Sequence, residues 1–309
     1  MSGGPVRIAF FGTPAPAVPA LTAFVDDPAV EVAAVVTNPD RPAGRGYKLT
    51  PSPVKTAAQD AGIPVWQPVK AREVRDDLRR LDVDACAVVA YGALLPEDVL
   101  AAGGAGFVNL HFSLLPAWRG AAPVAHAILH GDTETGVTCF VLEAGMDTGP
   151  VLLAERTAIH EGETAGELTA RLARIGAPLL VAAVRGLVDR SIDPMPQDHD
   201  RATYAPKINP DDARLDWRGD AVALHNAVRA FNPVPGAHTT FAGERLKVHR
   251  AIPVEGSGDP GVVTVTGEGP VVACASGALR LDEVQPAGRP RMSGADFANG
   301  YRPGGQRLG

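Results

Sequence analysis

Short apolar runs recur along the first 190 residues and are separated by longer amphipathic segments. The apolar runs cover residues 6–11, 30–37, 85–90, 106–112 and 137–142. Runs of this length, with few polar interruptions, are typical of strands that are buried on both faces of a sheet. Gly12 directly follows the first run, as expected where a buried strand ends in a turn.

The segments between these runs carry signals for the ends of helices. Ser52 and Pro53 combine a good N-cap with a proline suited to the first helical turn, and Gly62 closes that helix. Thr164 and Glu167 fit a capping box, and apolar residues continue after them at helical spacing. Strands that alternate with helices predict a Rossmann-like α/β fold, in which a mostly parallel sheet is covered by helices on both faces.

The pattern changes after about residue 189. Residues 191–210 are polar, contain four prolines and show no period, which predicts a linker. One helix is expected at about 220–231. The short alternating runs that follow predict a small antiparallel β-barrel of the OB-like kind; they lie at 237–241, 244–251, 261–265, 271–273 and 279–284. We therefore expect the α/β domain at 1–189, the linker at 190–209 and the β-barrel domain at 210–309.

The composition is that of an ordinary globular protein, with 45% hydrophobic and 21% charged residues. No apolar run is long enough to cross a bilayer, and the first residues lack both a basic segment and an apolar signal core. The three cysteines, Cys86, Cys139 and Cys274, lie far apart in apolar settings, which favours reduced core thiols. These features predict a cytoplasmic protein without membrane contact.

The formal net charge of −6 argues against nucleic-acid binding by the whole surface. The charge is uneven, however, because residues 200–309 carry a net +1 and the remaining residues a net −7. The second domain could therefore present a basic face to a nucleic acid.

The turn after the first apolar run does not fit a dinucleotide site. Residues 11–16 lack G-x-G-x-x-G, and Pro14 and Pro16 remove N–H donors that would cradle a pyrophosphate. We expect neither nicotinamide nor flavin binding at this turn. No P-loop and no zinc-ligand spacing occurs elsewhere in the sequence.

Asn109 and His111 are the first candidates for chemistry. They are two residues apart at the end of a predicted strand, so both point to the face of the sheet opposite Leu110. Ligands of open α/β sheets bind at such carboxyl ends. Asp147 follows another apolar run on a glycine-containing loop. An amide, an imidazole and a carboxylate could run acyl transfer between nitrogens, but all three could equally be core or turn residues.

Several segments together resemble the methionyl-tRNA formyltransferases along nearly the full length of the chain. These segments are Phe11–Pro14, Asn38–Gly46, Pro51–Lys55, Val89–Gly92, Asn109–Pro116, Trp118–Pro123, Gly145–Gly149, Arg229–Pro233 and Gln285–Gly288. The Asn-x-His pair, the aspartate and Ser-Leu-Leu-Pro are shared by folate-dependent formyltransferases in general, so they specify the chemistry and leave the acceptor open. The Arg-Pro-Ala-Gly-Arg-Gly loop and the second domain are more specific to the tRNA enzymes.

The resemblance implies transfer of the formyl group of 10-formyltetrahydrofolate to the amino group of methionyl-initiator tRNA, for translation initiation. It implies that Asn109, His111 and Asp147 are catalytic. We expect the pKa of His111 to be raised by the neighbouring carboxylate, so that the imidazole donates or shuttles the proton. The resemblance implies folate contacts at Ser113, Leu114, Leu115, Pro116, Tyr91 and Gly92. No metal is implied, and we expect a monomer.

The acceptor is expected to meet two basic regions. Arg41, Arg45 and Lys48 lie on a loop rich in glycine and proline, where cations suit phosphate contacts. The resemblance implies that this loop reaches into the acceptor stem and that Arg45 matters most. In the second domain, the candidates for a basic tRNA channel are Lys207, Lys247, Arg250, Arg289 and Arg291.

Two alternatives stay open at this point. A related formyltransferase could act on a sugar nucleotide or a small amine, since such enzymes share the Asn-x-His pair. A folate-binding or RNA-binding module without turnover is the second alternative. The arginine loop favours tRNA over the first, and the presence of all three catalytic residue types favours an enzyme over the second.

Overall fold

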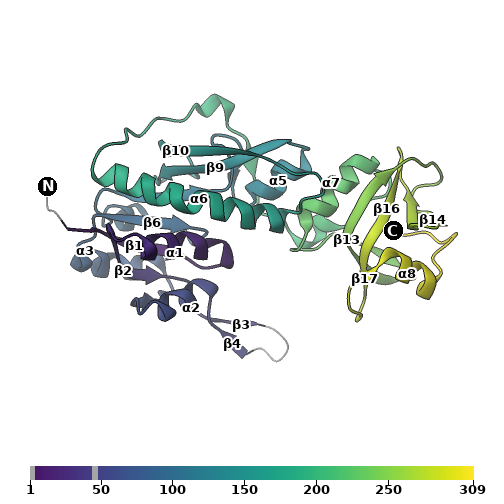
Figure 1. Ribbon diagram of the computed structural model, residues 1–309, viewed down its shortest axis with the longest axis horizontal. Helices are drawn as coiled ribbons and strands as arrows, with labels where there is room; N and C mark the ends of the chain where they lie inside the picture. The colour runs from purple at the N-terminus through teal and green to yellow at the C-terminus, as the bar shows by residue number, and fades with distance from the viewer. Residues whose placement is uncertain (1–3, 44–47) are drawn as a thin grey trace. The chain divides into compact units, whose positions relative to one another are not determined.

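The computed structural model describes residues 4–43 and 48–309 (Figure 1). The chain forms two compact units. Unit 1 contains Met1–Gly120, Gly136–Thr157 and Thr169–Tyr204, and unit 2 contains Ala121–Thr135, Ala158–Leu168 and Ala205–Gly309. The segments at 121–135 and 158–168 therefore group with the C-terminal part of the chain, although they lie within its first 189 residues.

Unit 1 is built on a seven-stranded sheet with the order β10-β9-β7-β6-β1-β2-β5. The strands are β1 (Val6–Gly12), β2 (Val30–Val36), β5 (Val65–Trp66), β6 (Ala85–Val89), β7 (Phe107–His111), β9 (Glu134–Val141) and β10 (Val151–Ala158). The pairs β1–β2, β1–β6, β2–β5 and β6–β7 are parallel, and β7–β9 is antiparallel. The predicted mostly parallel α/β sheet is confirmed.

The helices of unit 1 are α1 (Val18–Asp26), α2 (Pro53–Asp60), α3 (Arg75–Leu81), α4 (Glu97–Leu100) and α6 (Ala165–Val188), whose first turn belongs to unit 2. Of these, α2 and α6 start at the caps that the sequence predicts. The Ser52 hydroxyl accepts the Lys55 N–H at 3.1 Å at the start of α2. At the start of α6, Thr164 and Glu167 exchange the two hydrogen bonds of a capping box.

Helix α6 lies directly on β7, and a glycine makes this close approach possible. A Cβ atom at Gly176 would lie 2.6 Å from Cδ1 of Leu110, so only glycine fits without displacement. Leu110 is 2% exposed beneath the helix. Because side chains alternate along a strand, Asn109 and His111 point to the opposite face. The packing of α6 therefore decides which face of β7 is available for chemistry.

A short hairpin extends from unit 1 and carries part of the predicted basic loop. It consists of β3 (Arg41–Ala43) and β4 (Lys48–Thr50), which pair antiparallel (Figure 1). The base of the hairpin is anchored because the Lys55 ammonium bonds to Asp40 at 2.6 Å and to Gln67 at 2.7 Å. These contacts fix where the hairpin leaves the sheet.

Unit 2 contains an antiparallel half-barrel with the strand order β12-β13-β16-β15-β14, and β17 pairs with β16. Its elements are α5 (Pro123–Leu129), α7 (Ala221–Phe231), β12 (His238–Phe241), β13 (Glu244–Val254), β14 (Val263–Thr266), β15 (Gly269–Ala273), β16 (Ala278–Pro286), β17 (Met292–Ser293) and α8 (Gly294–Tyr301). Helix α5 packs on α7. The predicted smaller antiparallel β domain is confirmed.

Two short strands join neither large sheet: β8 (Arg119–Gly120) pairs with β11 (Tyr204–Ala205). Within the part of the chain that the structure describes, no helix has the length and apolar character needed to span a bilayer.

Helix α7 supplies a stability prediction, because its N-cap is a single side chain. Asp220 accepts the N–H groups of Val222 at 2.8 Å and Ala223 at 3.3 Å. Asp220→Ala should lower the free energy of unfolding by about 1 kcal/mol, and Asp220→Asn, which keeps the acceptor oxygen, should recover most of that loss. Urea denaturation of the three proteins measures both effects. Equal stability of the alanine variant and the parent would show that the cap contributes nothing.

Candidate active site

The carboxyl ends of β1, β6 and β7 meet at one edge of the unit 1 sheet. Strand β1 comes first in the chain, and the later strands lie on both of its sides: β2 and β5 on one side, and β6 and β7 on the other. Ligands of open α/β sheets bind outside such a switch point. Asn109 lies opposite Val88 of the parallel strand β6, and His111 ends β7 at the same edge.

The Asn109 side chain is half-buried, and no hydrogen-bond partner for its amide is found among the described residues. Side-chain amides in partly buried sites are normally paired with protein or water. The Asn109 amide is therefore free to donate to an oxygen of a bound molecule. Its position two residues before His111 on one face of β7 brings it beside the imidazole.

The His111 imidazole is nearly enclosed, with 7% of its side chain exposed. Nε2 lies 2.9 Å from the carbonyl oxygen of Trp118. A carbonyl oxygen only accepts, so Nε2 carries the proton of the neutral ring. Nδ1 then has a free lone pair, and it faces Oδ2 of Asp147 at a distance of 3.8 Å. The neutral imidazole is thus prepared to take a proton on the side of the carboxylate.

The pKa of His111 is lowered below its ordinary value, and the expectation of a raised pKa is wrong in its direction. Burial is the largest cause, because an enclosed imidazole loses the hydration of its charged form. The Asp147 carboxylate and the Trp118 carbonyl both raise the pKa, but less than burial lowers it. The sequence showed the carboxylate and could not show how deeply the ring is enclosed.

Asp147 is held in a tight loop between β9 and β10. Its φ angle is +51°, in the left-handed region that residues with a Cβ adopt rarely. Oδ2 accepts the Gly120 N–H at 2.7 Å. The backbone carbonyl of Asp147 accepts Nε2 of Gln197 at 2.9 Å, and that of Gly149 accepts the same nitrogen at 2.7 Å. The structure thus brings Asp147 and His111 together.

Gln197 was not identified from the sequence. It lies in the segment 190–209, which is polar and aperiodic, and yet its side chain is 8% exposed. A buried glutamine in a proline-rich segment leaves no periodic signal, because its partners, 48 and 50 residues away, become visible only after folding. The segment expected to be a linker therefore contributes to the support of the Asp147 loop.

The predicted folate-contacting residues follow β7 or β6 directly. Ser113 is fully buried and donates to the Ala117 carbonyl at 2.6 Å, while Leu114, Leu115 and Pro116 are half-buried. Tyr91 is 3% exposed and its pKa is raised by burial. The Tyr91 carbonyl accepts Nδ2 of Asn38 at 2.7 Å. Gly92 is exposed, with a φ of +79°. Ser113 and Tyr91 thus support loops whose other residues are accessible.

The residues predicted to contact tRNA differ in their exposure, and two of them are not fully described by the structure. Arg41 is exposed on β3, whereas Arg45 and the side chain of Lys48 lie outside the described residues. In unit 2, Lys207 is exposed and Lys247 is half-buried on β13. Arg250 is exposed and forms an ion pair with Glu167, which partly neutralises its charge. Arg289 and Arg291 are also exposed.

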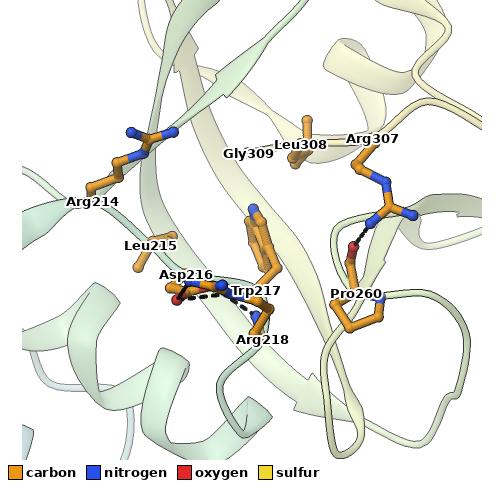
Figure 2. A pocket seen from close by; sticks show the side chains of 9 residues that line it. All are labelled: Arg214, Leu215, Asp216, Trp217, Arg218, Pro260, Arg307, Leu308 and Gly309. Carbon is orange, nitrogen blue, oxygen red and sulfur yellow. Dashed lines mark hydrogen bonds and ion pairs between the residues drawn. The ribbon is translucent and has the colours of Figure 1, made fainter.

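A hollow of about 750 Å³ lies entirely within unit 2, and none of the three candidate catalytic residues lines it. Figure 2 shows Arg214 and Arg307 on its two sides, with the Trp217 indole between them. Arg307 donates to the Pro260 carbonyl at 2.7 Å, and Arg218 is bound to Asp216. Among the described residues no group of three or more His, Cys, Asp and Glu side chains forms a metal-ligand cluster.

Comparisons with known proteins place this geometry in a family. The sequence profile described as formyl transferase matches residues 6–184, and the profile described as formyl transferase, C-terminal domain, matches residues 207–302. The methionyl-tRNA formyltransferase of Streptomyces griseus is 47% identical over 301 residues, which cover 96% of this chain and 97% of that protein. That of Pseudomonas savastanoi pv. phaseolicola is 48% identical over 302 residues, which cover 96% of each.

Two solved structures share the fold of this chain. A structure of HypX from Aquifex aeolicus superposes with a TM-score of 0.69 at 16% identity and covers 98% of this chain and 49% of that one. The sugar 3N-formyl transferase WlaRD superposes with a TM-score of 0.67 at 17% identity, over 93% of this chain and 100% of that one. At these identities the likeness shows the fold alone. The full-length matches at nearly half identity decide the family: this chain is a member of the methionyl-tRNA formyltransferases.

Proposed function

We propose that the protein transfers the formyl group of 10-formyltetrahydrofolate to the α-amino group of methionyl-initiator tRNA, forming N-formylmethionyl-tRNA for translation initiation. The observation that carries this proposal is the His111–Asp147 pair beside an unpartnered Asn109 amide, in a chain nearly half identical to methionyl-tRNA formyltransferases over its whole length. The arrangement suits acyl transfer between two nitrogens, because it offers an amide donor, a proton acceptor and a fixed carboxylate.

Asn109 has the role of stabilising the oxyanion. The neutral α-amine attacks the formyl carbon, a C–N bond forms, and the carbonyl electrons move to oxygen. The Asn109 amide is available to donate to this oxygen, because no described residue occupies it. A donor that is already in place stabilises the developing charge without reorganisation during the reaction.

His111 has the role of moving the proton. Burial keeps the ring neutral, so Nδ1 can accept the proton that the amine loses when it becomes an amide. The imidazolium that forms is stabilised by Asp147, whose carboxylate already lies 3.8 Å away. The proton then passes to N10 of the folate as the bond between N10 and the formyl carbon breaks.

The donor proposal has support from structural relatives. WlaRD was crystallised in the presence of 5-N-formyl-THF, and one structure of HypX from Aquifex aeolicus is a complex with tetrahydrofolic acid. For this chain we propose that the folate lies along the loops that follow β6 and β7. Gly92 and the half-buried Leu114, Leu115 and Pro116 offer accessible contacts there, and Ser113 and Tyr91 shape the loops.

For the acceptor, we propose that residues 1–189 carry the chemistry and the arginine loop, and that residues 210–309 bind the tRNA body. Arg41 and Arg45 are the proposed contacts to the acceptor stem. In unit 2, Arg214 and Arg307 at the hollow of Figure 2 join Lys207, Lys247 and Arg250 as proposed phosphate contacts. A hollow with arginines around a tryptophan suits a nucleic acid backbone better than a small apolar ligand.

The deciding test is a formyl-transfer assay with 10-formyltetrahydrofolate and three acceptors: methionyl-initiator tRNA, free methionine, and an amino-sugar nucleotide. We expect turnover with the tRNA alone. Turnover with the amino-sugar nucleotide and none with the tRNA would assign the chain to the sugar-modifying enzymes. Folate binding without transfer to any of the three would favour a binding module.

The roles of the three candidate catalytic residues give one prediction. His111→Ala and Asp147→Ala should each lower kcat by about 10²-fold or more, since both affect the moving proton. Asn109→Ala should have an effect of about the same size through lost stabilisation of the oxyanion. Single-turnover kinetics at saturating donor and tRNA measure these losses, and circular dichroism checks the fold. A well-folded Asp147→Ala protein with the parental kcat would exclude the proposed triad.

The lowered pKa of His111 gives a prediction of pH-dependent stability. Because the folded-state pKa lies below the unfolded value, the unfolded chain binds more protons, and stability is lost as pH falls through the unfolded pKa of about 6.5. In His111→Gln this contribution disappears. The stability of the parent minus that of His111→Gln should therefore fall between pH 7.5 and pH 5.5, with a slope of at most ~1.4 kcal/mol per pH unit. Urea denaturation across this range measures it, and a difference independent of pH would contradict the neutral imidazole.

Arg45 gives a prediction specific to the tRNA acceptor. Arg45→Ala should weaken reaction with methionyl-tRNA at subsaturating tRNA and leave folate binding unchanged. The salt dependence of kcat/KM for tRNA should become shallower by roughly one unit in a log–log plot, as expected for one lost phosphate contact. Arg72→Ala is the matched control, because Arg72 is an exposed arginine of the same unit that pairs with Asp98. Equal salt slopes in Arg45→Ala and the parent would remove the loop from the tRNA interface.

A further inference from the structure

An arginine without a countercharge is buried behind the Asp147 loop. Arg119 is 2% exposed, and no carboxylate of the described residues lies within 4.0 Å of its guanidinium nitrogens. Its Nε and Nη2 instead donate to Oε1 of Gln197, at 3.2 and 2.6 Å. Nη2 also lies 3.0 Å from Nδ1 of His199. Because burial of an unpaired guanidinium is unfavourable, a purely structural position would more readily hold an apolar side chain or an ion pair.

The guanidinium fixes the orientation of the Gln197 amide. Arginine can only donate, so the oxygen of Gln197 must face Arg119 and the NH₂ group must face away. The NH₂ group then reaches the backbone carbonyls of Asp147 and Gly149, which accept at 2.9 and 2.7 Å. One amide therefore closes the turn around Thr148. If the amide were reversed, its oxygen would meet two carbonyl oxygens and its nitrogen would meet a guanidinium.

The backbone next to Arg119 holds the other side of the same aspartate. The N–H of Gly120 donates to Oδ2 of Asp147 at 2.7 Å, and this is the oxygen that faces Nδ1 of His111. Arg119 itself is anchored, since its own N–H donates to the Thr203 carbonyl at 2.8 Å. Residues 119 and 120 thus act on both the backbone and the carboxylate of Asp147, whose positive φ angle needs such support.

We propose that Arg119 and Gln197 are positioning residues that hold the Asp147 carboxylate against the His111 imidazole during formyl transfer. Neither side chain contacts the imidazole; both act through the loop that presents Asp147. The inference rests on the catalytic role proposed above for Asp147. A displacement of this carboxylate by about 1 Å would be enough to lower the rate by about 10²-fold, since effective proton transfer depends on the position of the groups.

Gln197→Glu separates positioning from structural support. Glutamate gives Arg119 a carboxylate partner, so a purely structural role predicts unchanged or higher stability and an unchanged rate. The same substitution removes both N–H donors and places an oxygen against the carbonyls of Asp147 and Gly149. We expect kcat for methionyl-tRNA to fall by about 10- to 100-fold, with the KM values for donor and tRNA changed less than about twofold and the fold retained by circular dichroism.

The matched control is Gln59→Glu, which adds the same charge to the same unit. Gln59 is exposed on α2, and no hydrogen bond joins its side chain to another described residue. We expect the parental kcat for this control. An equal loss of kcat in both glutamate variants would mean that any such charge harms the enzyme, and it would overturn the inference.

Arg119→Lys is a second variant with the same charge. It keeps a cation but loses the planar fork that fixes the amide. If the carboxylate moves away from His111, the imidazole loses a contribution that raises its pKa. We therefore expect the His111 ring, followed by NMR in the folded protein, to titrate at lower pH in Arg119→Lys, as in Asp147→Ala. A purely structural arginine would leave this titration where it is in the parent, which would overturn the inference.

A double-mutant cycle completes the test, because residues that act through one another are not additive. Gln197→Glu added to Asp147→Ala should cause no further loss of kcat. A full additional loss would show that Gln197 acts elsewhere. Parental kcat in Gln197→Glu, together with a strong loss in Asp147→Ala, would overturn the positioning role alone. Parental kcat in Asp147→Ala would overturn the proposed site itself, so the two failures are distinguishable.

Discussion

The candidate site depends on the opposition between burial and charge at His111. Burial lowers the pKa of the imidazole, and the Asp147 carboxylate raises it by less. The ring is therefore neutral until a proton arrives, and the carboxylate then stabilises the charged form. This balance requires a carboxylate at a defined distance from an enclosed ring. The packing of α6 on Leu110 leaves Asn109 and His111 on the opposite face of β7, and the loop that carries Asp147 brings the carboxylate to that face.

The Asp147 loop shows why local sequence was insufficient to describe the site. Asn109 and His111 were found because a strand places residues i and i+2 on one face, and the apolar run that defines β7 is local. Asp147 was found by its glycine-rich surroundings and by resemblance. Arg119 and Gln197 meet it only because residues 116–120 and 197–203 lie side by side after folding. Contacts over 48 to 85 residues leave no periodic trace in a single sequence.

The fold could be predicted from the sequence more fully than the site, because the sequence signals for strands and helix caps are local. The apolar runs predicted β1, β2, β6, β7 and β9. Strand β10 was missed because half of its residues are exposed at the sheet edge, and its sequence has the composition of a surface segment. The grouping of residues 121–135 with unit 2 could likewise not be predicted from the sequence. Helix α5 is apolar on nearly every side, and its packing on α7 is a tertiary property that its own sequence does not reveal.

The segment at 190–209 has a consequence for the minimal catalytic fragment. A protein that ends at residue 189 would contain Asn109, His111 and Asp147, and it would lack Gln197. Its Asp147 loop would lose both bonds from the glutamine amide, and Arg119 would be buried without its main acceptor. Such a fragment would have all three candidate catalytic residues and still be poorly organised for transfer. The length of chain needed for chemistry is therefore set by the residues that support the aspartate, and not by the residues that touch the substrate.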